Sequence, residues 1–346
     1  MSDNLSTGWD LGGAHLKAAQ VDSTGRLVAA VQVPCTLWLG IDHLIRAVEE
    51  ARRSLSPTRR QGVTMTGELV DLFDSRAEGV RRLAAAVAEA LPGTDLRLYA
   101  GEAGFVPLEG AADRAQEIAS ANWHASVQFV AACCREGLFV DVGSTTTDIL
   151  PFADGAVRNA GYTDAERLIT EELVYTGVTR TPVMALADSV PFAGERQRLM
   201  AEYFATTADI HRLTGALPED ADQLPTADGR GKSTEDSARR LARMLGRDLE
   251  TADRTAWRRL ARHLADRQHV MLQAAVDRIL SRGIIADDAP VIGAGVGRFL
   301  LPELARRLAR PYTDFADLLT GDSTVREWAA RCAPATAVAA LAAQGW

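Results

Sequence analysis

Two short stretches of sequence decide the fold of this chain: GWDLGGAHLK at residues 8–17 and DVGSTTTD at residues 141–148. Each stretch has aspartate and glycine where an apolar run ends, and each leads into a second apolar run. This pattern predicts a strand, a tight glycine turn and another strand. Because the arrangement occurs twice, the sequence predicts two similarly built halves.

Both loops contain the residue types that bind phosphate. Glycine tolerates positive φ and lets backbone N–H groups approach an anion that a β-carbon would block. Side-chain hydroxyls add donors for phosphate oxygens, and Lys17 adds a point charge. The predicted phosphate-binding residues of the two loops are Gly12, Gly13, Gly143, Ser144, Thr145, Thr146 and Thr147.

Carboxylates stand beside these donors. Asp10, Asp141 and Asp148 would repel a bare phosphate, so they predict a magnesium ion, held by Asp10 and Asp141 partly through water. Taken alone, the first loop fits a plain hairpin turn equally well. The second loop, with its consecutive hydroxyl residues between two aspartates, favours a binding site. Together the loops predict magnesium-dependent phosphate chemistry.

The composition predicts a globular protein of two ordinary domains. The chain has 346 residues, 47% of them hydrophobic, and a net charge of -8 that argues against nonspecific nucleic-acid binding. It has no apolar stretch long enough for a membrane span and no signal-peptide pattern, so we expect a cytoplasmic protein without a membrane partner. The cysteines, Cys35, Cys133, Cys134 and Cys332, lack metal-ligand spacing. The oligomeric state stays open.

Strand and helix patterns alternate along the chain, which predicts an α/β fold. We expect a first domain at 1–125, a second at 126–332 that contains a helical insertion, and a C-terminal helix within 333–346 that packs back on the first domain. The predicted helices include 163–175, 195–213, 234–245 and 255–281. The segment 216–233, which is rich in proline and acidic residues, predicts a surface loop that could act as a lid.

A third glycine turn occurs late in the chain, where residues 290–292 lead into Gly293, Gly295 and Gly297 before a helix at 302–308. Strand, glycine turn and helix in this order suit a nucleotide or another phosphorylated ligand at the helix N-terminus. Close packing of a helix on a strand explains the same glycines equally well.

The paired loops and the late turn resemble the actin, hexokinase and Hsp70 superfamily, in which a ligand lies between two ribonuclease-H-like domains with mixed sheets. Within it, the chain resembles the hydantoinase and oxoprolinase relatives. The resemblance narrows to the tetrahydromethanopterin-linked one-carbon-transfer family, a group connected with methanofuran biosynthesis. It rests on residues 8–18, CTLW at 35–38, ELVYTGVTRTPV at 172–183, FATTAD at 204–209 and TADG at 226–229.

This resemblance implies a reaction in which an aminomethylfuran-methyl diphosphate is joined to the phenol oxygen of γ-glutamyltyramine or a related phenol, with release of diphosphate. Lys17 and magnesium would stabilise the departing anion, and His15 or Asp148 would take the phenol proton. ATP is not expected to be required, and the partners are small molecules. The resemblance also implies that Asp228 and Lys232 close over the diphosphate, and that Tyr175 and Arg180 line the cleft for the amine substrate; a solvated loop, a buried aromatic side chain and a surface ion pair are the structural alternatives.

Two other classes of protein fit the same loops. One is an ATP- and magnesium-dependent kinase, or a hydrolase of the hydantoinase/oxoprolinase type. The other is a noncatalytic, actin-like protein that binds nucleotide and changes its domain closure. Turnover of ATP without a furan substrate would favour the former, and nucleotide binding without any product would favour the latter.

Overall fold

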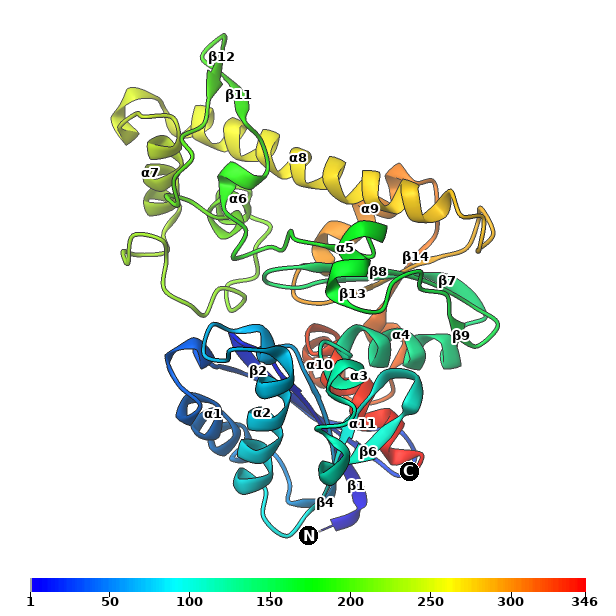
Figure 1. Cartoon of the computed structure of the whole chain (residues 1–346). Helices are drawn as coiled ribbons and strands as arrows, with labels where there is room; N and C mark the ends of the chain where they lie inside the picture. The colour runs from blue at the N-terminus through cyan, green and yellow to red at the C-terminus, as the bar shows by residue number, and fades with distance from the viewer. Residues whose placement is uncertain (1) are drawn as a thin grey trace.

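The structure, a computed structural model, describes residues 2–346 (Figure 1). Its strands are β1 Ser2–Leu11, β2 His15–Asp22, β3 Leu27–Pro34, β4 Thr58–Met65, β5 Asp95–Tyr99, β6 Phe105–Pro107, β7 Glu136–Val142, β8 Thr147–Ala153, β9 Ala156–Val157, β10 Leu173–Val174, β11 Ser189–Phe192, β12 Glu195–Arg198, β13 Val291–Ala294 and β14 Tyr312–Asp314. Its α-helices are α1 Asp42–Arg52, α2 Arg76–Ala90, α3 Ala115–Ile118, α4 Asn122–Cys133, α5 Asp164–Thr170, α6 Thr207–Thr214, α7 Thr234–Met244, α8 Arg254–Leu280, α9 Leu301–Arg307, α10 Ser323–Arg331 and α11 Ala333–Ala343.

Two mixed sheets repeat one topology. The first has the order β3-β2-β1-β4-β5-β6, and the second has the order β10-β8-β7-β13-β14. In each sheet an antiparallel hairpin, β1–β2 or β7–β8, is followed by parallel strands on the other side of its first strand. The register is also equivalent, because Asp10 lies opposite Lys17 in the first hairpin and Asp141 lies opposite Asp148 in the second.

The sheets and helices form five layers (Figure 1). Helices α1 and α2 cover the outer face of the first sheet, α4, α10 and α11 lie between the sheets, and α8 and α9 cover the outer face of the second. Helix α11 approaches β1 so closely that a β-carbon on Gly8 would overlap the backbone of Ala335 and Ala339. The C-terminal helix therefore packs on the strand that leads into the first loop.

The alternation of side chains along a strand turns both loop aspartates toward the middle layer. Asp10 shares a face of β1 with Gly8, which contacts α11. Asp141 shares a face of β7 with Phe139, which belongs to the core between the sheets. Because residues two apart in a strand point to the same side, both carboxylates face the space between the two halves.

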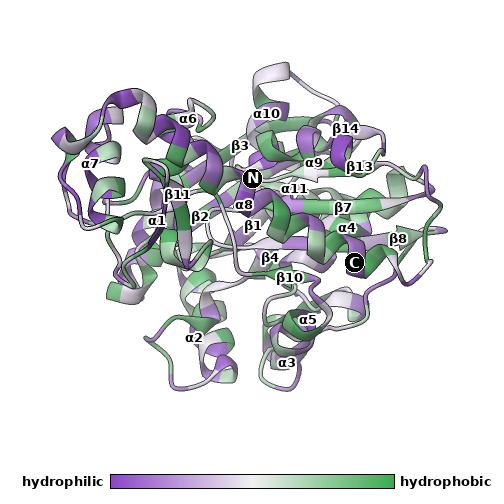
Figure 2. Cartoon of the chain, turned by 90° about the horizontal axis from the view of Figure 1, so that it is seen from above, coloured by the Kyte–Doolittle hydropathy of each residue, from purple (hydrophilic) through white to green (hydrophobic). Residues whose placement is uncertain are grey.

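A helical unit extends from the second half. Helices α6 and α7, the first part of α8 and the β11–β12 hairpin share a separate apolar core. Helix α7 carries both hydrophilic and hydrophobic residues along its length, as expected for a helix with one buried face (Figure 2). The predicted helix at 195–213 is wrong: residues 189–198 form a hairpin that turns at Ala193 and Gly194, both at positive φ, and only 207–214 is helical.

The other helix predictions differ in accuracy. Helices α7 and α8 confirm the predictions at 234–245 and 255–281 to within a residue or two. The helix predicted at 163–175 is shorter, because Glu171 adopts a left-handed conformation and β10 follows. The domain boundary expected near residue 125 lies inside α4. Among the helices of residues 2–346, none is long and apolar enough to cross a membrane.

Candidate active site

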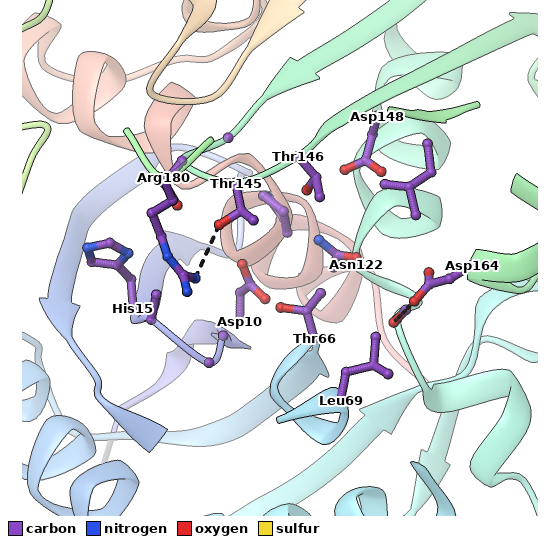
Figure 3. Close-up of a pocket in the computed structure, with 18 of the residues that line it drawn as sticks. Asp10, His15, Thr66, Leu69, Asn122, Thr145, Thr146, Asp148, Asp164 and Arg180 are labelled. Atoms are coloured by element: carbon purple, nitrogen blue, oxygen red, sulfur yellow. Dashed lines mark hydrogen bonds between the residues drawn. The ribbon is translucent and has the colours of Figure 1, made fainter. Parts of the chain in front are cut away.

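A cavity of about 490 Å³ lies where the two hairpin loops face each other across the middle layer. Strand alternation brings Asp10 and Asp141 into it, and the two loops and the segment after β10 form its walls (Figure 3). The predicted site residues that line the cavity are Asp10, Gly12, Gly13, His15, Lys17, Asp141, Gly143, Ser144, Thr145, Thr146 and Asp148, together with Tyr175 and Arg180.

Thr147 faces away from the cavity. Its hydroxyl is fully buried and donates a hydrogen bond of 2.7 Å to the carbonyl of Thr176. This contact fixes the end of the second loop. The role in phosphate binding predicted for Thr147 therefore has no support from its position.

The late glycine turn lies outside the cavity. A β-carbon on Gly293 would meet the ring of Tyr312, and one on Gly297 would meet Val142 and Val178. Gly295, at a φ of +87°, packs against Asp141. These glycines let the turn pack closely against β7, β14 and Leu301 of α9, and the contact of Gly293 in β13 with Leu301 is the helix-on-strand packing that the sequence left open.

The expected lid residues also lie away from the cavity. Asp228 accepts a hydrogen bond from the buried guanidinium of Arg240, with an Nη1–Oδ1 distance of 3.0 Å. Lys232 donates to the carbonyl of Asp222 at 2.6 Å. Both side chains stabilise the loop between α6 and α7 in this structure, so a contact with diphosphate would require that loop to move.

Asp10 and Lys17 form the ionic centre of the first loop. Lys17 Nζ lies 3.7 Å from Asp10 Oδ2, while Asp10 Oδ1 is buried without a hydrogen-bond partner among the described residues. Burial raises the pKa of Asp10, against the opposing effect of Lys17. Burial would lower the pKa of Lys17, but Asp10 and Asp141 outweigh it and the net direction is upward. Lys17 therefore stays charged, and Asp10 has an oxygen free for another cation.

Asp141, the first aspartate of the second loop, forms no ion pair with another side chain of residues 2–346, whereas Asp10 is paired with Lys17. Burial raises its pKa to about 7, although Lys17 lowers it. No group of three or more His, Cys, Asp or Glu side chains within residues 2–346 is arranged to hold a metal directly. The donor set of Asp10 and Asp141 therefore fits a magnesium ion that keeps several of its waters, and it does not fit a site built only from protein ligands.

Asp148 is paired with an arginine that sequence reasoning missed. Arg167, from α5, donates to Asp148 Oδ1 and to the carbonyl of Glu172, and its guanidinium lies 4.4 Å from the ring centre of Trp123. Burial raises the pKa of Asp148, with Arg167 acting against it. Because this carboxylate is already neutralised by a fixed cation, its lone pairs are less available for a substrate proton. Nothing in the sequence around Arg167 sets it apart from a surface arginine.

His15 remains available as a base. The residue is buried, and its Nε2 has no hydrogen-bond partner among residues 2–346. Burial, with the positive charges of Lys17 and Arg180 adding to it, lowers its pKa to about 4. At neutral pH the imidazole is uncharged, so it can accept a proton, although such a low pKa makes it a weak base.

The segment after β10 holds the second loop in place. Backbone N–H groups of Thr179 and Arg180 donate to the carbonyl of Ser144 at 3.1 and 2.9 Å. Gly177 lies directly on Ser144, where a β-carbon would approach its backbone carbon to 2.5 Å. Gln268 of α8 donates to the carbonyl of Gly177 at 2.9 Å. These contacts connect the loop conformation to the long helix.

The far end of the cavity carries a second polar network. Ser120 and Asp164 line the cavity there, and Arg76 of α2 donates to Asp164 across the two halves at 2.5 Å. The Ser120 hydroxyl lies 2.8 Å from Glu68, whose other oxygen is buried without a described partner. Burial raises the pKa of Glu68 to about 7. No local sequence pattern marks this group, because its members come from four separate segments.

Comparison with known proteins identifies the family of this chain. The hydantoinase/oxoprolinase family matches residues 59–312. The chain belongs to this family. The (4-{4-[2-(gamma-L-glutamylamino)ethyl]phenoxymethyl}furan-2-yl)methanamine synthase of Methanocaldococcus jannaschii is 31% identical over 297 residues, which cover 86% of this chain and 87% of that protein. The synthase of the same name from Methanococcus vannielii is 38% identical over 112 residues, 32% of this chain and 50% of that protein.

The solved structures that resemble this chain are distant in sequence, so they inform on its fold alone. Nucleotide-free acetone carboxylase aligns with 86% of this chain and 66% of its own, at 11% identity and a TM-score of 0.55. A ROK family glucokinase from Streptomyces griseus covers 99% of this chain and 100% of its own, at 15% identity and a TM-score of 0.48. The expected α/β fold with two similarly built mixed sheets and the resemblance to the hydantoinase relatives are confirmed.

Proposed function

We propose that this chain forms the aryl ether of a methanofuran-type cofactor, as an alkyl transferase. The electrophile is an aminomethylfuran-methyl diphosphate, and the nucleophile is the phenol of γ-glutamyltyramine or a related tyrosine-derived compound. The observation that carries the proposal is the match over nearly the whole length of the M. jannaschii synthase, whose named product contains this phenoxymethyl-furan ether. The cations, carboxylates and hydroxyls that line the cavity support the proposal.

The reaction breaks the bond between the furfuryl carbon and a diphosphate oxygen, and it forms a bond between that carbon and the phenol oxygen. The leaving diphosphate takes the bonding electrons, and a base takes the phenol proton. Because an electron-rich furan stabilises positive charge on the attached carbon, stabilisation of the leaving anion controls the rate. The cationic side chain of Lys17 and the backbone N–H group of Gly13 are the groups of the first loop suited to this task, because the N–H of Gly12 already donates to the carbonyls of Asp10 and His15.

The second loop faces the first and adds hydroxyl donors from Ser144 and Thr146, for which the structure records no competing hydrogen bond within residues 2–346. A magnesium ion held through Asp10 and Asp141 would supply additional positive charge to the diphosphate. His15 Nε2 is the candidate acceptor for the phenol proton, since Asp148 is occupied by Arg167.

The test is to incubate the purified protein with the furan diphosphate, magnesium and each of tyramine, tyrosine and γ-glutamyltyramine. Mass spectrometry should detect the ether and an equal amount of diphosphate without ATP, and added diphosphate should inhibit. A strict requirement for ATP, with ADP formed in step with product, would move the protein to the kinase or ligase class.

The same assay tests the magnesium assignment. Asp10→Asn and Asp141→Asn should each lose most activity and shift the magnesium dependence to higher concentration, while Asp113→Asn, an exposed change away from the cavity, should behave like the parent. Near-normal turnover of both loop variants at saturating magnesium would remove the assignment.

A further inference from the structure

Arg180 is a cation in the cavity without a carboxylate partner. Among residues 2–346, no carboxylate oxygen lies within ion-pair distance of its guanidinium, whereas the other cavity cations, Lys17 and Arg167, are paired with Asp10 and Asp148. Arg180 Nη1 instead donates to the hydroxyl of Thr145 at 3.2 Å (Figure 3). Its positive charge therefore remains available to an anionic ligand.

Both halves of the protein hold this side chain in position. Its own backbone N–H donates to Ser144 in the second loop at 2.9 Å. Its guanidinium lies 5.7 Å from the ring centre of Trp38, which belongs to the short 3-10 helix Leu37–Leu39 of the first half. Trp38 lines the cavity and is 39% exposed, and its ring gives the guanidinium a flat surface that does not neutralise its charge.

The surroundings of Arg180 favour a multiply charged anion. On one side is Thr145 of the hydroxyl-rich loop, and in Figure 3 His15 of the first loop lies beside the guanidinium. A guanidinium presents several N–H donors in one plane and can contact two phosphate groups at once, which a lysine cannot do. A ligand with two linked phosphates would satisfy this fork and the loop donors together.

We propose that Arg180 binds the diphosphate group itself and selects diphosphate over monophosphate, with Trp38 holding the guanidinium across the cleft. This inference rests on the proposed function, because it assigns the leaving group of that reaction to particular side chains. It differs from the role that the family resemblance implied, in which Arg180 lines the cleft for the amine substrate.

The experiment measures binding of two probes, inorganic diphosphate and orthophosphate, by calorimetry in the presence of magnesium. Arg180→Gln should weaken diphosphate binding about tenfold or more and change orthophosphate binding by less than about threefold. Arg180→Lys should recover only part of the loss, because it restores charge without the fork. Trp38→Leu should weaken diphosphate binding by a smaller factor. Arg81→Gln, an exposed arginine of α2, is the matched control.

Arg180 is exposed, so these substitutions should leave the fold intact, which circular dichroism can verify. Unchanged diphosphate affinity in Arg180→Gln, or an equal loss for both probes, would overturn the inference, as would the absence of diphosphate binding by the parent protein. Arg180-dependent diphosphate binding by a protein that makes no ether would support the inference and contradict the proposed function. Ether formation by the parent protein, together with an unchanged diphosphate affinity in Arg180→Gln, would support the proposed function and contradict the inference.

Discussion

Substitution of Glu68 by glutamine should stabilise the protein at alkaline pH. Glu68 as a whole residue is 1% exposed, and one of its carboxyl oxygens has no hydrogen-bond partner among the described residues. Burial raises its pKa from 4.5 to about 7, with Asp164 adding to the effect and Ser120 opposing it. The folded state therefore retains a proton that the unfolded chain releases between these two pH values.

The magnitude follows from this difference in proton affinity. Above pH 7 the folded protein must hold a buried negative charge, and the free energy of unfolding is lowered by roughly 3 kcal/mol relative to acidic conditions. Below pH 4.5 the carboxyl is protonated in both states and the penalty disappears. Glutamine keeps the acceptor for the Ser120 hydroxyl but cannot ionise. The stability of Glu68→Gln relative to the parent should therefore grow by about 2 to 3 kcal/mol from pH 5 to pH 8.

Urea unfolding of both proteins at several pH values measures this quantity. The compared quantity is how the difference in unfolding free energy between Glu68→Gln and the parent changes with pH. A cost of packing the amide that does not depend on pH therefore cancels. Glu109→Gln provides the control, since Glu109 is exposed and its substitution should shift stability by no more than about 0.5 kcal/mol at any pH. A stability difference between Glu68→Gln and the parent that stays constant from pH 5 to pH 8 would refute the reasoning.

Three further predictions concern the cavity. Lys17→Ala should raise the activation free energy for the furan diphosphate by on the order of 3 kcal/mol, which lowers turnover roughly a hundredfold. A much smaller effect in steady-state kinetics would show that this cation does not contact the leaving group. His15→Gln should be partly rescued by ring-substituted tyramines of lower phenol pKa; the same dependence on phenol pKa as in the parent would exclude His15 as the base. Gly177→Ala should displace Ser144, because the new β-carbon would lie 2.5 Å from its backbone, and should reduce both stability, by roughly 1 to 3 kcal/mol, and turnover, whereas Gly110→Ala, with open space around it, should change neither.

Local sequence determined the two hairpins and much of the site. An apolar run, a glycine turn and a second apolar run specify a β-hairpin from neighbouring residues alone, and each hairpin carries its own aspartate and donors. The pairing of Asp10 with Lys17 across β1 and β2 follows from that hairpin register. Helices α7 and α8 were predictable for a similar reason, since each has a capping side chain and an apolar face.

Only the tertiary structure decided which charges remain free. Asp148 is neutralised by Arg167, a residue 19 positions away. Arg180, in contrast, has no carboxylate within ion-pair distance in the described part of the chain, and it faces the second loop from the segment after β10. The Glu68 network and the hairpin at 189–198 were equally hidden, and only the structure decided between the two explanations of the late glycine turn. Hydrophobic period and turn residues report on neighbours within about one turn of chain, whereas ion pairing and burial depend on segments that meet only when the two sheets close on the helices between them.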